Sequence, residues 1–369
     1  MTILNSKSVT KNKVTIADVG RLAGCSKGVV SAVVNNARGN ISVSEQLRER
    51  VMNAAAQLGY RPNFASQSLA RKTTQTIGIY VAPREGASMG FPYESRILRG
   101  IEMACRDRDY DLLVLNLGGN MTPEQCLSRF AERRMDGVMI VHVDHDASWV
   151  APLVTHNHNV VSVNYYGDQP MLANVIFDDR KAASRAVQHL VELGHQRIGY
   201  LGGVAADHGP GGALRLAGYR QGMAEAKLPV QYELIFDVRN PMFDQHLNEI
   251  GWSWEDGPNG AEYFMALGDA CPTALVCYGD TLCLRAMHYL QAKGYRVPDD
   301  ISLIGIGDEE TSRIANPSLS SIRMPLEDMS AYATNALIDN VQRGNGSTPS
   351  ERLLWPPKLI ARGSTAPPR

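Results

Sequence analysis

The chain has 369 residues, 44% of them hydrophobic and 20% charged, a balance that excludes a disordered, collagen-like or coiled-coil protein. Its length predicts two or three domains, each able to bury a core of its own. No apolar run approaches the roughly 18 residues that span a bilayer, and the polar N-terminus lacks a secretory signal, so we expect a cytoplasmic protein with no membrane partner.

The six cysteines are scattered along the chain and include no C-x-x-C pair. Reduced thiols in a cytosolic protein are the plain interpretation. The even spacing of Cys271, Cys277 and Cys283 fits no metal-binding template, so we expect neither a metal nor any other cofactor.

The net charge of −1 conceals a strongly basic N-terminal segment. Residues 1–72 hold eleven Lys and Arg against three Asp and Glu, a charge of +8, so the remainder of the chain carries −9. A basic module on an acidic body favours contact with a polyanion such as nucleic acid. Basic tails also occur on proteins that bind no polyanion, so the charge alone does not decide.

The basic segment begins with a predicted helix over residues 16–23. Thr15 and Asp18 have the spacing of a capping box at its start, because the acid stands three residues after the capping hydroxyl. Gly24 provides the stop, since glycine accepts the left-handed conformation that commonly ends a helix.

Two further helices follow in the basic segment. Ser26 caps the second, which runs to about residue 35. Its interior is rich in β-branched residues and is also typical of a strand, but the tight turn before it and the helical spacing of its valines favour a helix. The third runs from Ser44 to Gly59. Two helices joined by a tight turn and supported by a third predict a helix-turn-helix module, with a three-helix scaffold that binds no DNA as the alternative.

Beyond residue 76, short apolar runs alternate with amphipathic helical stretches, which predicts βαβ units and parallel sheets. Nearly 290 residues are too many for one open sheet of this rhythm, so we expect two lobes. The predicted fold class is therefore α/β, with an all-α helix-turn-helix headpiece before a two-lobed core. No G-x-G-x-x-G or P-loop fingerprint follows a strand, which speaks against a dinucleotide or nucleoside-triphosphate enzyme.

Ordered motifs from residue 14 to 366 resemble the lactose/galactose repressor family. They include V-T-I-A-D-V-G-R-L-A-G-C-S at 14–26, L-G-Y-R-P-N at 58–63, L-R-G-I-E at 98–102, R-L-A-G-Y at 215–219, V-P-D-D-I-S at 297–302 and R-G-S-T at 362–365. The resemblance implies a core like that of periplasmic sugar-binding proteins behind the DNA-binding headpiece. The implied boundaries are 1–60 for the headpiece, 61–75 for a hinge and 76–369 for the core, with lobes at 76–175 plus 307–325 and at 176–306 plus 326–369.

In that family the second helix enters the major groove, and the residues just after its capping serine read bases. Those positions here are Lys27 and Gly28, with Ala32 one turn further on. Glycine and alanine cannot make a bidentate bond to guanine, so base reading rests mainly on Lys27. Further candidate DNA contacts are Thr15, Ser26, Ser31 and Asn35. Thr15 and Ser26 can serve as helix caps as well as phosphate contacts.

The resemblance also implies a hinge that folds into a short helix on the operator. Asn63 and Ser66 lie in this segment, and Leu69 occupies the place where the family inserts a leucine wedge into the minor groove. Simple hinge packing is the alternative for Leu69. The turn after the second helix is longer than usual for the family, and its polar residues either add backbone contacts or form a solvated loop: Asn36, Arg38 and Asn40.

A small effector is expected between the two lobes. Arg215 matches a family arginine that contacts effectors, and its guanidinium can hold vicinal hydroxyls or a carboxylate. The other candidate effector contacts are Tyr93, Asn164, Trp252, Trp254 and Asp280. Each tryptophan is either a stacking platform or a core residue, and Asp280 is either a ligand group or a helix cap.

Three positions depart from the family's sugar-binding pattern. Gly279, Gly307 and Met324 stand where the family commonly has Asn, Asp and a polar residue that is often Gln. The loss of three polar contacts weakens any direct transfer of a pyranose pocket to this chain.

The resemblance therefore implies a dimeric transcription regulator, a repressor, controlled by a sugar or sugar derivative. Its expected partners are a double-stranded DNA operator, the carbohydrate effector and a second copy of the chain. Residues 361–369 cannot form the leucine-heptad helix by which some relatives make tetramers. The alternative is a solute-binding protein of a transporter. An enzyme is disfavoured because we find no nucleophile–base spacing and no metal cluster.

Overall fold

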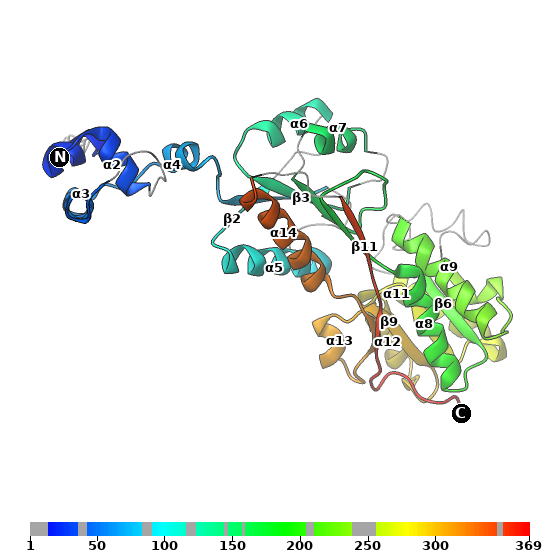
Figure 1. Ribbon diagram of the computed structural model, residues 1–369. Helices are drawn as coiled ribbons and strands as arrows, with labels where there is room; N and C mark the ends of the chain where they lie inside the picture. Colours follow the sequence, from blue (N-terminus) through cyan, green and yellow to red (C-terminus); the bar gives the residue numbers. More distant parts are fainter. Residues whose placement is uncertain are drawn as a thin grey trace, which may run out of the picture. The chain divides into compact units, whose positions relative to one another are not determined.

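The computed structural model describes residues 14–35, 43–82, 91–115, 123–143, 147–156, 159–203, 210–237, 256–344 and 350–369 (Figure 1). The chain divides into two compact units. The first, which we call the headpiece unit, is Met1–Thr76 with Arg133–Asp136, and the second, the core unit, is Ile77–Glu132 with Gly137–Arg369. Within the described residues, no helix combines the length and the apolar character needed to cross a bilayer.

The three predicted headpiece helices are confirmed. They are α1 (Ile16–Ala23), α2 (Lys27–Val34) and α3 (Glu45–Leu58). Ser26 and Ser44 accept hydrogen bonds from the backbone of α2 and α3, and Gly24 and Gly59 end α1 and α3 in the left-handed conformation. The small apolar side chains between the helices are buried and form the headpiece core: Val19, Ala23, Val30, Val33, Val51, Ala54 and Ala55.

The tight turn between α1 and α2 depends on a glycine. A Cβ at Gly20 would lie 2.8 Å from the carbonyl oxygen of Cys25, closer than side-chain atoms tolerate. The amide of Cys25 in turn donates to the carbonyl of Gly20 at 2.9 Å. This close approach holds α2 against α1, so helical packing overrides the strand propensity of the valines in α2.

A fourth helix, α4 (Phe64–Arg71), lies in the segment predicted as the hinge. Asn63 caps it by accepting from the amide of Ala65 at 3.1 Å, and it ends at Lys72, whose φ of 60° is left-handed. Helix α4 precedes the first core strand.

The first lobe of the core unit is built on a six-stranded sheet in the order β11-β5-β4-β3-β1-β2. Each adjacent pair from β11 through β5, β4 and β3 to β1 is parallel. The strands are β1 (Thr76–Val81), β2 (Asp111–Leu115), β3 (Gly137–Val141), β4 (Val160–Val163), β5 (Ala173–Phe177) and β11 (Glu351–Trp355). The helices are α5 (Pro92–Asp107), α6 (Pro123–Ala131), α7 (Val150–His156) and α14 (Leu326–Gln342).

The second lobe has a six-stranded sheet in the order β12-β10-β9-β8-β6-β7, antiparallel only between β10 and β12. The strands are β6 (Ile198–Gly203), β7 (Ile235–Asp237), β8 (Ala274–Cys277), β9 (Ser302–Gly307), β10 (Ser320–Arg323) and β12 (Lys358–Ile360). The helices are α8 (Asp179–Glu192), α9 (Pro210–Glu225), α11 (Asp256–Ala266), α12 (Asp280–Ala292) and α13 (Glu310–Ile314), with short 3-10 turns η2 (Tyr232–Leu234) and η3 (Gly268–Ala270).

The predicted lobe boundaries are wrong in the last fifth of the chain. Residues 307–325 were expected in the first lobe, but β10 pairs with β9 inside the second sheet. The second lobe is the predicted place of residues 326–369, but α14 packs against α5 and β11 pairs with β5 in the first sheet. The prediction is correct only for the end of this range, where β12 pairs with β10 in the second sheet. The chain thus changes lobe after β5, after β10 and after β11 (Figure 1). One hydrophobic cluster contains buried side chains from both sheets.

Candidate nucleic-acid interface and interlobe polar cluster

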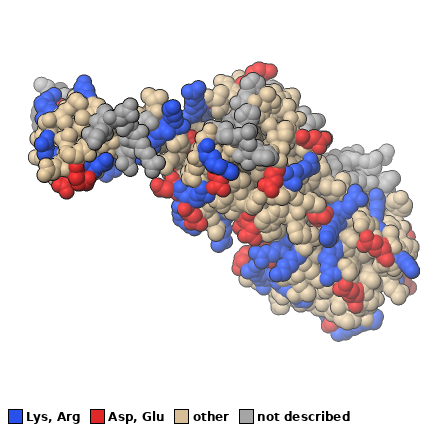
Figure 2. Space-filling view, viewed as in Figure 1, with Lys and Arg blue, Asp and Glu red and all other residues tan. Residues whose placement is uncertain are grey.

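The headpiece unit presents the first turn of α2 to solvent. Lys27 and Gly28 are exposed, and Ser31 and Ala32 are partly exposed. On the visible face of this unit, basic side chains cover more area than acidic ones (Figure 2). A short exposed helix end with a lysine and adjacent small residues can approach the edge of a DNA groove closely.

The remaining predicted headpiece contacts fall into three groups. Thr15 and Ser26 sit at the N-caps of α1 and α2, where the Asp18 carboxylate accepts from the hydroxyl of Thr15 at 2.7 Å. Asn35 is buried at the end of α2, and its Nδ2 donates to Ser31 Oγ at 3.1 Å, so its predicted contact with DNA stays a prediction. Asn36, Arg38 and Asn40 lie outside the described residues.

Helix α4 carries the predicted hinge residues on an exposed surface. Asn63 and Ser66 are exposed, and Leu69 is 83% exposed. Leu69 has little packing within the headpiece unit, so the structure gives no support to the alternative that it is a packing residue of the hinge. An exposed leucine on a short helix is available to bind a partner, and the predicted partner of Leu69 is the minor groove of DNA.

The linker after α4 is held by one carboxylate. Asp136 accepts from the backbone amides of Thr74 and Gln75 at 2.7 and 2.8 Å, from the hydroxyl of Thr74 at 3.0 Å, and from the hydroxyl of Thr73. Since Asp136 directly precedes β3, this carboxylate fixes the linker at the start of the core strands. Sequence reasoning missed this role.

We expect the Asp136→Ala variant to loosen this linker. Three consecutive residues lose their shared acceptor, so the free energy needed to unfold the linker locally falls by roughly 1–3 kcal/mol. Trypsin should then cut after Arg71 or Lys72 several-fold faster, measured by mass spectrometry of timed digests. Asp107→Ala, at the end of α5, is the control and should leave the rate unchanged. An unchanged rate for Asp136→Ala would mean that the anchor contributes nothing to linker order.

Several predicted effector residues meet in one group of side chains, which we call the interlobe cluster. Its members come from both lobes and the segments between them: Tyr93, Asn164, Tyr166, Asp179, Arg215, Tyr278 and Met324. Asn164, left-handed with φ of 55°, follows β4 and donates through Nδ2 to the Tyr93 hydroxyl at 2.7 Å. Its Oδ1 accepts from the amide of Phe177 at 2.8 Å, which ties the end of β4 to the end of β5.

Arg215 is the charged centre of the interlobe cluster. Its Nε donates to Asp179 Oδ1 at 2.6 Å, its Nη1 donates to the carbonyl of Tyr278 at 2.6 Å, and its guanidinium lies 4.5 Å from the centre of the Tyr278 ring. Tyr166 donates to the other oxygen of Asp179. Among the described residues, Nη2 has no hydrogen-bond partner.

Burial shapes the charge states of this cluster. Burial is the largest single influence on Arg215 and lowers its pKa, but Asp179, Tyr278 and Tyr166 together outweigh burial and raise the pKa of Arg215 above its usual value. Burial, with Asp179 nearby, also raises the pKa of Tyr166, and burial raises that of Tyr93. Both phenols therefore stay neutral. The cluster therefore contains one permanent cation, the guanidinium of Arg215, whose charge Asp179 partly balances. Nη2 of this guanidinium can still donate a hydrogen bond.

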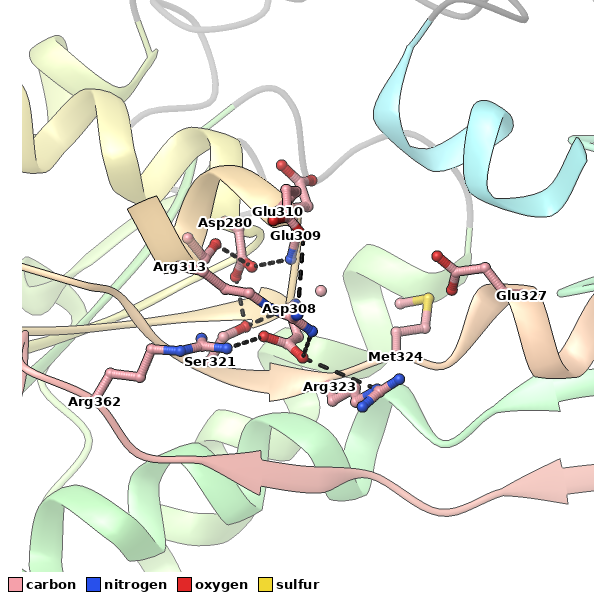
Figure 3. A network of polar contacts seen from close by, with 12 residues as sticks. Asp280, Asp308, Glu309, Glu310, Arg313, Ser321, Arg323, Met324, Glu327 and Arg362 are labelled. Atoms are coloured by element: carbon pink, nitrogen blue, oxygen red, sulfur yellow. Dashed lines mark hydrogen bonds and ion pairs between the residues drawn. The ribbon is translucent and has the colours of Figure 1, made fainter. Parts of the chain in front are cut away.

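Asp280 does not join the interlobe cluster. Gly279 is the N-cap of α12, and the buried carboxylate of Asp280 accepts from Ser321 Oγ at 2.6 Å, Ser312 Oγ at 2.7 Å and the amide of Glu309 at 2.9 Å (Figure 3). Burial raises the pKa of Asp280, and these hydrogen bonds oppose that rise. The helix-cap role predicted for Asp280 is therefore wrong, because Gly279 holds that position, and the effector role stays a prediction. Its oxygens join α12, α13 and β10.

A neighbouring carboxylate, Asp308, extends this network. Asp308 pairs with Arg362, and Arg313 and Arg323 approach its second oxygen to 3.7 and 3.9 Å (Figure 3). Arg96 of α5 donates to the carbonyls of Gly307 and Met324, at 2.9 and 2.7 Å. These contacts secure the point where the chain leaves β10 for α14.

The other predicted effector residues have mixed outcomes. Trp252 and Trp254 lie outside the described residues. Sequence reasoning missed Asp179, Tyr166 and Tyr278, although the pair Asp178–Asp179 directly after a buried strand was an available signal. Among the described residues, no group of three His, Cys, Asp or Glu side chains is placed to hold a metal ion.

Comparison with known proteins gives two matched segments. Residues 15–63 match bacterial regulatory proteins of the lacI family, and residues 187–365 match a periplasmic binding protein-like domain. The chain is similar to the HTH-type transcriptional repressor PurR of Vibrio cholerae serotype O1, at 31% identity over 89% of this chain and 91% of that protein. It is also similar to the ribose operon repressor of Haemophilus influenzae, at 27% identity over 95% and 98%.

A similar architecture is found among solved structures. The lac repressor dimer bound to operator and the anti-inducer ONPF matches with a TM-score of 0.77 and 26% identity, over 96% of this chain and 100% of that chain. The match includes both the three-helix segment and the two-lobed core.

Proposed function

The chain belongs to the lacI family of bacterial regulatory proteins, and from that premise we propose how its residues divide the work of a DNA-binding repressor under effector control. The exposed start of α2 reads the operator, α4 contacts the minor groove through Leu69, and the interlobe cluster binds the effector. The observation that carries this division is Arg215, buried between Asp179 and Tyr278 with one nitrogen unpartnered among the described residues.

The DNA-binding form is a homodimer that reads two half-sites with twofold symmetry, as the lac repressor structure is a dimer on its operator. The transporter alternative does not hold, because the relatives are repressors and residues 15–63 match a DNA-regulatory family. We further propose that the protein works in the cytoplasm and carries no enzymatic activity.

The effector acts by differential binding to two arrangements of the lobes. The chain changes lobe at three places, so rotation of one lobe on the other moves the first-lobe end from which the linker departs. Asp136 holds that linker through Thr73 and Thr74. A change in lobe angle is thereby passed to α4, whose position decides whether two hinge helices can pair on DNA.

The experiment that tests this function is selection of genomic fragments by the purified chain, followed by gel shift and footprinting of the selected operator. We expect Lys27→Ala to weaken operator binding by roughly 1–3 kcal/mol while binding to scrambled DNA changes little, because base reading depends on this side chain. Fluorescence anisotropy on both duplexes measures the ratio.

Lys181→Ala on α8 serves as the matched control for a removed lysine, and it should leave both affinities unchanged. Equal loss on operator and scrambled DNA would show that Lys27 contacts only phosphates. No loss on either duplex would remove Lys27 from the interface.

A further inference from the structure

One carboxylate oxygen beside the interlobe cluster lacks a partner. Glu94, in the first turn of α5, is 4% exposed, and its Oε1 lies 2.7 Å from His142 Nε2. Its Oε2 is buried with no hydrogen-bond partner. Because a buried polar atom is costly to leave unpaired, such an atom marks a place where a bound molecule can supply the missing bond.

Glu94 is joined to the cluster through its neighbour. The ring of Tyr93 lies 5.0 Å from the ring of His142, and the hydroxyl of Tyr93 accepts from Asn164. The charges of Asp179, Arg215 and Glu94 also influence the pKa of Tyr93. Glu94 is therefore connected to the interlobe cluster through Tyr93, its neighbour in the chain, and through the ring of His142 that lies against Tyr93.

The balance of charge in this region disfavours an acidic ligand. The region holds two carboxylates, Glu94 and Asp179, and one guanidinium, that of Arg215, whose Nε already donates to Asp179. Arg96, two residues along α5, is committed to Glu327 through two bonds of 2.9 Å. A ligand carboxylate or phosphate would meet no unmatched cation among these groups.

The hydrogen-bonding pattern is also selective. The region offers an acceptor at Glu94 Oε2 and a donor at Arg215 Nη2. Gly279, Gly307 and Met324 contribute no polar side-chain group apart from the weakly accepting sulfur of Met324, which Nδ2 of Asn164 approaches at 3.9 Å. A hydroxyl can both donate and accept, and an amino group can donate to a carboxylate strongly.

We propose that the effector is a non-acidic sugar, neutral or amino, and that Glu94 is the residue that selects it by accepting a hydrogen bond from a ligand hydroxyl or amino group. The proposal rests on the function assigned above, since it concerns the same cluster. The sequence left open whether Arg215 holds vicinal hydroxyls or a carboxylate of the effector. Under this proposal Arg215 binds hydroxyls and not a carboxylate.

The test uses the full chain and sets of matched pyranoses that differ in charge. D-glucose, D-glucosamine and D-glucuronate form one set, their galacto counterparts form a second, and D-ribose and cellobiose are added. Thermal shift identifies binders and calorimetry gives their dissociation constants. We expect at least one neutral or amino sugar to bind at least tenfold more tightly than the uronate of its set.

Glu94→Gln replaces the carboxylate by an amide of the same shape. We expect this variant to bind the tightest-binding sugar at least tenfold more weakly than the wild type does. We also expect a smaller ratio between the dissociation constants of the matched uronate and of that sugar. Glu102→Gln is the matched control, because Glu102 lies on the same helix with a side chain that is 59% exposed. It should leave every constant unchanged. Should Glu94→Gln fail to fold by circular dichroism, the charge ranking of the wild-type chain decides the proposal.

Three outcomes overturn the proposal: a uronate that binds most tightly, a folded Glu94→Gln variant that binds as the wild type does, or no binding by any sugar of the panel. Operator titration and the Arg215→Ala variant separate this failure from failure of the assigned function. If the chain binds operator and Arg215→Ala loses a ligand that Glu94→Gln keeps, the function stands and only the role of Glu94 is wrong.

Discussion

A core chain that begins at Thr76 should stay folded and lose operator affinity by at least about 10³-fold, because specific contacts reside in the headpiece unit. Residues 1–72 also hold the charge of +8, so the truncation removes the phosphate contacts that supply non-specific affinity. Anisotropy at several salt concentrations measures both effects. The DNA affinity of the full chain should fall steeply as the salt concentration rises, and the truncated core should show no DNA binding at any of these concentrations.

Circular dichroism and thermal melting provide the control for the truncation. The core unit has both six-stranded sheets and a continuous cluster of buried apolar side chains, so its melting transition should persist. Loss of the transition would show that the core needs residues before 76. Full operator affinity in the folded core would overturn the assignment of DNA binding to the headpiece unit.

The second large effect concerns Arg215 and Leu69, which should fail in opposite ways. Arg215→Ala removes charged donors from the effector, so we expect roughly 10- to 100-fold weaker effector binding and an abolished effector response, with effector-free operator affinity nearly intact. Leu69→Ala removes an apolar wedge, so specific DNA binding should fall roughly 10- to 100-fold with unchanged effector affinity of the free protein.

Arg215→Lys is the necessary companion, because Arg215→Ala leaves Asp179 buried without its cation and can destabilise the fold. Lysine retains the charge beside Asp179 but lacks the planar fork that reaches Asp179 and the Tyr278 carbonyl together. It should keep the melting temperature closer to wild type and still weaken effector binding. Normal effector binding by both variants would mean that the effector binds elsewhere.

Much of the architecture could be predicted because it rests on local signals. Ser26, Ser44, Gly24 and Gly59 mark helix ends through short-range backbone geometry, and the helices begin and end as these residues indicate. The alternation of apolar runs and helices likewise predicts two parallel sheets. These features depend on neighbours within a few residues, which a sequence displays directly.

The lobe assignment near the C-terminus failed for a different reason. Strand β10 is short and rich in serine, and it is buried because its polar groups are satisfied from far along the chain. The amide of Ser320 donates to Ser364 Oγ at 2.8 Å, and Ser321 donates to Asp280 at 2.6 Å. Hydrophobic patterning cannot reveal a strand whose burial depends on such distant hydrogen bonds.

The candidate site shows the same limit. Arg215 was found through the resemblance, but its partner Asp179 stands 36 residues before it, and His142 stands 48 residues after Glu94. Neither pair has a spacing that marks it in the sequence. Asp280 was misassigned because its position before a helix suggested a cap, whereas the fold brings Ser312 and Ser321 to its carboxylate.

The central claim is that effector binding at the interlobe cluster and operator binding at the headpiece unit share one equilibrium. The most direct measurement is the operator dissociation constant of the full chain with and without a saturating effector, paired with the effector dissociation constant on free and operator-bound protein. Linkage requires the two ratios to be equal, and we predict a common factor between about 5 and 150. An operator dissociation constant that does not change at saturating effector would contradict the account.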